Sequence, residues 1–78
     1  MNLEKAKSLL EIAVEDNADY YAEQVLEELE KAEAEYNATP FSPPDNLPLY
    51  LNWLNASSRL SDAKKTAIEL AKSLYGDL

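Results

Sequence analysis

The chain has 78 residues, of which 15 are acidic and 7 are basic, so its formal net charge is −8. A chain of this length forms one domain, residues 1–78, whose core rarely supplies more than about 3–5 kcal/mol of stability. Cysteine and histidine are both absent, which excludes disulfides, the usual transition-metal ligands and the commonest catalytic base. We therefore expect no cofactor and no bound metal.

The negative charge is confined to the first half of the chain. Residues 1–39 contain eleven acidic residues and three lysines, whereas residues 40–78 contain four acidic and four basic residues. Such a field repels nucleic acid and anionic membranes and attracts basic protein surfaces. No uninterrupted apolar stretch resembles a signal peptide or spans a bilayer, so we expect a soluble, cytoplasmic protein.

Two helices are expected in the acidic half, over residues 1–14 and 18–36. Apolar residues recur at helical spacing in both segments. The Asp-Asn-Ala-Asp cluster at residues 16–19 favours a break, because Asp and Asn compete for backbone hydrogen bonds and cap the following helix. A single helix bent through Asn17 is the alternative.

The second half begins with a loop over residues 37–46, because its prolines cannot continue a helix. A short third helix is expected from residue 47 to about Ser57, with Pro48 in its first turn. Ser61 is expected to cap a fourth helix that stops at Gly76. The pattern predicts an all-α protein, a small four-helix (or bent three-helix) bundle with a Pro-rich loop between helices two and three.

No combination of residues in the chain is typical of an active site. The Glu-x-x-His motif of di-metal helical bundles cannot occur, and no serine lies in a glycine-flanked elbow. Carboxylates repeat only along helix surfaces, where water keeps them in their ordinary ionised state. We expect that the protein is not an enzyme.

Acidic residues follow one strip of the second helix. At the helical spacing, Asp19, Glu23, Glu27 and Glu30 lie beside the apolar stripe, and Glu11 and Glu15 form a similar strip on the first helix. Tyr20 points outward among these acids. The strip either serves as a solvated helix face or, with Tyr20, binds an arginine-rich partner surface.

The third helix is the other unusual segment, because residues 47–58 contain no charged side chain. A helix that is apolar all round must be buried on nearly every side. It is therefore either the central helix of the core or a contact with another chain. In the second case, Leu49, Tyr50 and Trp53 would form the contact of a homodimer.

The leading hypothesis is a protein-binding module, a stoichiometric inhibitor or regulator whose acidic N-terminal helices occupy a basic surface of a partner protein, for example a nucleic-acid-binding one. In size, charge and helicity alone the chain resembles small phage or bacterial inhibitors, namely anti-CRISPR and anti-restriction proteins and acidic immunity proteins. The alternative is a homo-oligomeric structural or assembly protein that associates through the apolar third helix. Its acidic surface would then serve solubility.

Overall fold

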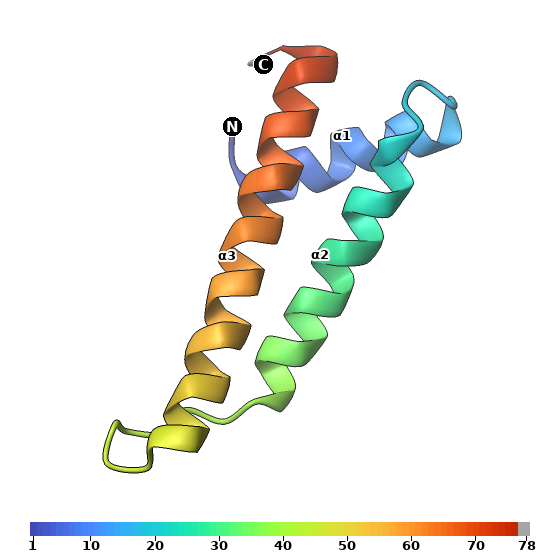
Figure 1. Cartoon of the computed structure of the whole chain (residues 1–78). Helices are drawn as coiled ribbons and strands as arrows, with labels where there is room; N and C mark the ends of the chain where they lie inside the picture. The colour runs from blue at the N-terminus through green and yellow to red at the C-terminus, as the bar shows by residue number, and fades with distance from the viewer. Residues whose placement is uncertain (77–78) are drawn as a thin grey trace.

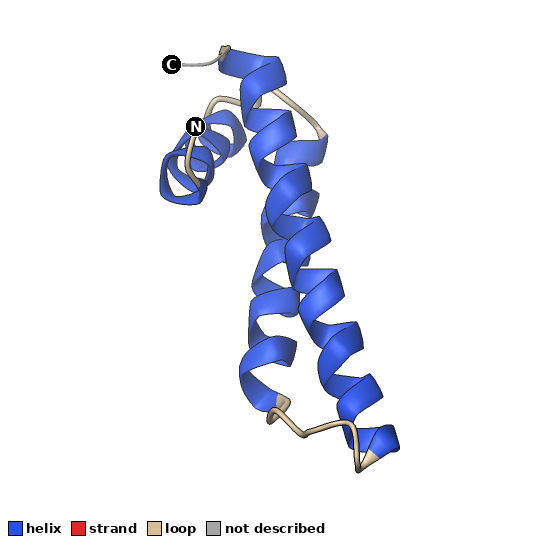
Figure 2. Ribbon diagram, turned by 90° about the vertical axis from the view of Figure 1, so that its left-hand side faces the viewer, coloured by secondary structure: helices blue, strands red, loops and turns tan. Residues whose placement is uncertain are grey.

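The computed structural model of the protein describes residues 1–76, and this part of the chain is all-α. It contains three helices, α1 (Leu3–Glu15), α2 (Tyr21–Ala38) and α3 (Leu47–Tyr75) (Figure 1). Helices α2 and α3 form a long antiparallel hairpin, and α1 lies across it near the C-terminal end of α3. Figure 2 shows α1 nearly end-on beside the upright hairpin. The molecule is elongated, with principal extents of 47 × 20 × 15 Å.

The number and division of the helices differ from the sequence-based prediction. The break expected between Ser57 and Ser61 is wrong, because α3 runs through it for 29 residues. No glycine or proline interrupts this stretch, and one apolar stripe continues through it toward the rest of the protein. The stripe consists of Ala56, Leu60, Ala63, Ala67 and Ala71. The alternative of a single helix bent through Asn17 is also wrong, since α1 and α2 are separate.

The turn between α1 and α2 follows from the Asp/Asn chemistry of residues 16–19. Asn17 adopts a left-handed conformation, with φ of 51°, which asparagine tolerates better than most residues. The N–H of Ala18 donates to the Ala13 carbonyl at 2.9 Å, and that of Asn17 to Val14 at 3.2 Å. These bonds satisfy carbonyls that the end of α1 would leave unpaired.

The second connection, residues 39–46, contains three of the four prolines. Helix α2 extends to Ala38, two residues beyond its expected end, before the prolines stop it. Pro48 lies in the first turn of α3, as expected. Gly76 ends α3 with φ of 78°, and its N–H donates to the Lys72 carbonyl at 2.8 Å.

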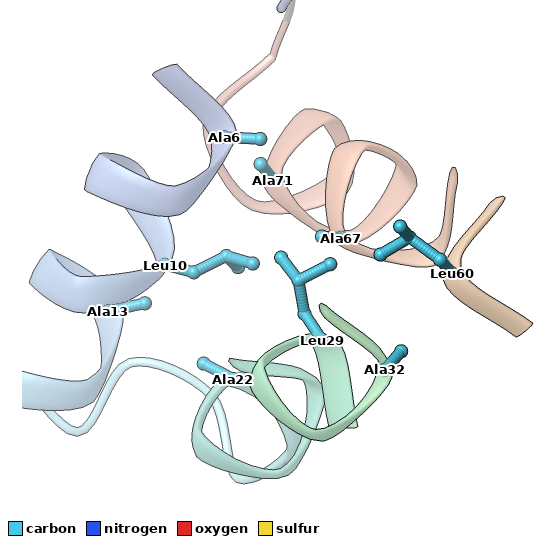
Figure 3. Close-up of a cluster of buried hydrophobic side chains, with 9 residues drawn as sticks. All are labelled: Ala6, Leu10, Ala13, Ala22, Leu29, Ala32, Leu60, Ala67 and Ala71. Carbon is cyan, nitrogen blue, oxygen red and sulfur yellow. The ribbon is translucent and has the colours of Figure 1, made fainter. Parts of the chain in front are cut away.

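The core lies where α1 crosses the hairpin, and it consists mainly of alanine. Leu10 of α1 and Leu29 of α2 point toward each other and toward α3 (Figure 3). They are the largest fully buried side chains among the described residues. The small alanines allow the helix backbones to approach closely. The cluster contains Ala6, Leu10, Ala13, Ala22, Leu29, Ala32, Leu60, Ala67 and Ala71.

The first two turns of α3 lie outside this core. Four leucines in this segment are 42% to 56% exposed, namely Leu47, Leu49, Leu51 and Leu54. The interpretation of residues 47–57 as the central helix of the core is therefore wrong. α1 covers only the other end of the hairpin, so no third helix packs on this segment (Figure 1).

Candidate functional site

Carboxylates from two helices face one shallow depression between α1 and α2. Its volume is about 390 Å³, and its lining contains no lysine or arginine. Val14 of α1 and Leu26 of α2 contribute the apolar part of the lining. The acidic residues that surround them are Glu11, Glu15, Glu23, Glu27 and Glu30.

A second depression of about 330 Å³ adjoins the first and shares Val14, Glu23 and Glu27 with it. Asp19 and Tyr20 line this second depression, and the Tyr20 side chain is 78% exposed. The Tyr20 ring stands edge-on to that of Tyr21, with ring centroids 5.3 Å apart. The structure thus brings all seven residues of the predicted acidic face together. We call this set the acidic surface: Glu11, Glu15, Asp19, Tyr20, Glu23, Glu27 and Glu30.

Local chain geometry explains why these residues meet. The left-handed turn at Asn17 reverses the chain, so the C-terminal end of α1 lies beside the first turns of α2. The Asp19 carboxylate accepts a hydrogen bond from the Tyr21 N–H at 2.7 Å and thereby caps the start of α2. Glu23, Glu27 and Glu30 then follow at i, i+4 and i+7 on one face.

The ion pairs of the described residues lie outside the acidic surface. Lys7 and Glu33 join α1 to α2, with Nζ and Oε1 2.8 Å apart. The hydrogen bond to Glu33 raises the pKa of the Lys7 ammonium above its ordinary value, although partial burial acts in the opposite direction. Arg59 of α3 pairs with Glu35 near the far end of α2. Both ion-paired carboxylates, Glu33 and Glu35, lie outside the acidic surface, although Lys7 also lies near Glu11 and Glu30 at its edge.

The lysines of α3 do not fold back onto the acidic surface. Lys64, Lys65 and Lys72 are exposed, and none of them lines either acidic depression. Over residues 1–76, no carboxylate of the acidic surface forms an ion pair. Lys31, one turn after Glu27 on α2, lines the groove between α2 and α3 and neither of the two acidic depressions. The acidic surface therefore carries a large excess of negative charge, with Lys7 as the cation at its edge, beside Glu11 and Glu30.

No family model, curated protein or solved structure matches this chain.

The residues predicted for self-association do not form one exposed face. Leu49 lines a small depression at the end of α2, together with Ala38 and Pro40. Tyr50 and Trp53 are half-buried. Phe41 of the proline-containing connection packs edge-on against Trp53, with centroids 4.8 Å apart. A contact of Phe41 with the helices was expected for a structural connection, but Phe41 stays 64% exposed, and its partner Trp53 could not be named from the sequence.

A groove between α2 and α3 was also missed by sequence reasoning. Its volume is about 550 Å³, and no residue of α1 lines it. The lining mixes apolar residues such as Val25 and Ala63 with acids and with the cations Lys31 and Arg59. The groove was missed because the expected break at residues 58–60 placed Arg59 in a loop and not on one helix with Ala63. Its mixed charge distinguishes it from the acidic surface.

In the part of the chain that the structure describes, no group of three or more acidic side chains is arranged to hold a metal ion. None of the three helices combines the length and apolar character that a bilayer-crossing segment requires.

Proposed function

We propose that this protein is a protein-binding module whose acidic surface occupies a basic surface of a partner protein. The observation that carries this proposal is the convergence of five carboxylates from two helices on one depression without a lysine or arginine in its lining. Like charges held this close repel one another. A partner that supplies arginine or lysine side chains would remove this repulsion and gain favourable charge pairs.

The surroundings of the carboxylates suit arginine in particular. Val14 and Leu26 offer apolar contact for the aliphatic part of a long cationic side chain. Tyr20 is exposed beside Glu23 and Glu27, where its ring face could stack on a guanidinium group. The partner surface is therefore one rich in arginine, such as a cleft that binds nucleic acid. Nucleic acid itself is disfavoured as a partner because it carries the same charge.

Binding of this kind makes the protein a stoichiometric inhibitor or regulator. A rigid acidic patch would imitate the spaced negative charges of a nucleic-acid backbone and would compete with it for the cleft. The proposal requires no catalytic residue in this chain.

The test compares two variants with equal net charge. The triple variant Glu23→Gln/Glu27→Gln/Glu30→Gln removes charge from the acidic surface. The triple variant Asp45→Asn/Asp62→Asn/Glu69→Gln removes the same charge elsewhere, and both have a net charge of −5 instead of −8. Each is immobilised and incubated with bacterial lysate at low ionic strength. Wild-type protein and the second variant should retain the same basic protein, and the first should lose it.

Ionic strength provides the second readout. The retained protein should elute as salt rises from about 50 to 200 mM, because the Debye length shortens to about 7–8 Å. Equal retention by the two triple variants would contradict the proposal, since placement of the charge would not matter. Retention that persists unchanged at high salt would contradict it as well.

A further inference from the structure

The first two turns of α3 present an apolar stripe that points away from the rest of the protein. Leu47, Leu51 and Leu54 follow at i, i+4 and i+7, so they share one helix face. They are 56%, 44% and 42% exposed, respectively. Ala56 and Leu60, which are buried, lie on the opposite face of α3. We call these three leucines the outer leucine stripe.

The distribution of charge favours a second copy of this chain as the partner of the outer leucine stripe. Residues 46–58 contain no charged side chain, although the whole chain carries −8. Two copies of this protein repel each other wherever their acidic halves approach. They can meet without that cost at the uncharged end of α3, which lies at the far end of the hairpin from α1 (Figure 1). A basic partner, in contrast, has no charge to pair with on this face.

The stripe is self-complementary. When two α3 helices pack antiparallel about a two-fold axis near Leu51, Leu47 of each copy meets Leu54 of the other, and the two Leu51 side chains meet at the axis. Past Leu54 the same face continues with Ser58, Ser61 and Lys65, so the apolar contact ends there. The pairing therefore has one favoured register.

The exposed area of the stripe determines how tightly two copies can bind each other. The three leucines of the stripe, at 56%, 44% and 42% exposure, together expose on the order of 250 Å². Two such stripes bury on the order of 500 Å² in total, well below the roughly 1,200 Å² at which stable specific interfaces begin. A weak dimer that depends on concentration follows.

We propose that the outer leucine stripe is a homodimer contact, in which two copies pair antiparallel through Leu47, Leu51 and Leu54. This contact differs from the one predicted from the sequence, which consisted of Leu49, Tyr50 and Trp53. In the structure, Phe41 packs on Trp53, and Leu49 faces the end of α2. The dimer holds its two acidic surfaces at opposite ends, so a single assembly presents two binding sites to basic partners.

Sedimentation equilibrium over a range of concentrations tests the proposal. Wild-type protein should change from monomer to twice the monomer mass, with a dissociation constant on the order of 100 µM. Leu51→Glu should raise that constant more than about ten-fold, because it places two carboxylates at the axis. The matched control Leu49→Glu changes an equally exposed leucine on another face, and it should dimerise like the wild type.

Disulfide trapping provides a readout that does not depend on a disruptive charge. The chain has no cysteine, so Leu51→Cys introduces a single thiol. Under mild oxidation, Leu51→Cys should form a covalent dimer faster than Leu49→Cys, since only residue 51 meets its own copy at the axis.

Three results would overturn the dimer. The first is a wild-type protein that stays monomeric at about 1 mM, roughly ten times the expected dissociation constant. The second is loss of the dimer in Leu49→Glu instead of Leu51→Glu. The third is disulfide trapping of Leu49→Cys and Leu51→Cys at equal rates. The effect of ionic strength distinguishes the homodimer from binding of a basic partner. Screening should strengthen the dimer, because it weakens repulsion between the acidic halves, whereas it should weaken binding to a basic partner.

Discussion

Two leucines are the largest fully buried side chains of the described residues, at the point where the three helices meet. Leu10 and Leu29 are fully buried, and alanines provide most of the remaining core. An alanine methyl group buries little area, so it contributes mainly by allowing helices to approach closely. Larger side chains such as Leu26, Ile68 and Leu74 pack around this centre but are only partly buried.

Replacing Leu10 with alanine should nearly abolish the fold. The loss of a fully buried leucine costs about 2–5 kcal/mol, comparable to the whole stability of a domain of this size. Ile12→Ala is the matched control on the same helix, because Ile12 is 45% exposed, and it should cost less than about 1 kcal/mol. Urea denaturation followed by circular dichroism measures both. Equal losses in the two variants would show that α1 does not pack as described.

Helix periodicity alone decides which acidic residues of one helix share a face, so the strip on α2 could be predicted from the sequence. Its meeting with Glu11 and Glu15 of α1, in contrast, depends on the turn at Asn17.

The sequence was a poorer guide to which apolar side chains neighbouring elements bury. Tyr21 falls at an apolar position of the helical pattern, yet it is 60% exposed. Leu49, Tyr50 and Trp53 were predicted as a contact between copies, but Tyr50 and Trp53 are half-buried, and Phe41 of the connection packs on Trp53. Burial depends on the position of neighbouring elements, which local pattern does not encode.

Among the elements, α3 shows how packing overrides local preference. Ser57, Ser58 and Ser61 favour helix ends, because their hydroxyl groups compete for backbone hydrogen bonds. The apolar stripe of α3 nevertheless continues through them toward Ala67. A break would disrupt packing of this stripe, and no glycine or proline in the segment enforces one. The turn at Asn17 was predictable for the opposite reason, since its Asp and Asn residues form it locally.

Asp62→Pro distinguishes a continuous α3 from two helices. In a continuous helix, proline at this position removes the bond from the residue 62 N–H to residue 58 and clashes with that turn, which costs about 3 kcal/mol or more. At the first position of a new helix capped by Ser61, proline would be tolerated. We expect a large loss in the thermal unfolding midpoint for Asp62→Pro and little change for Asp62→Ala. A stable Asp62→Pro variant would restore the two-helix interpretation.

The whole molecule has two dissimilar ends. The crossing of α1 over the hairpin gathers the core and the acidic surface at one end, and the other end carries exposed leucines and no charge over residues 46–58. The imbalance of charge along the chain could be predicted from composition. The position of α1 across the hairpin could not, because it depends on how three apolar faces pack together.

The most direct test of the oriented acidic surface is to map where a simple cationic probe binds. A hexa-arginine peptide is titrated into the isotope-labelled protein at low salt, and backbone amide chemical shifts are followed by NMR. We expect the largest shifts within residues 11–30, and we expect them to vanish at moderate salt. Shifts of equal size around Asp45, Asp62 and Glu69 would contradict an oriented surface, because the peptide would then respond only to total charge.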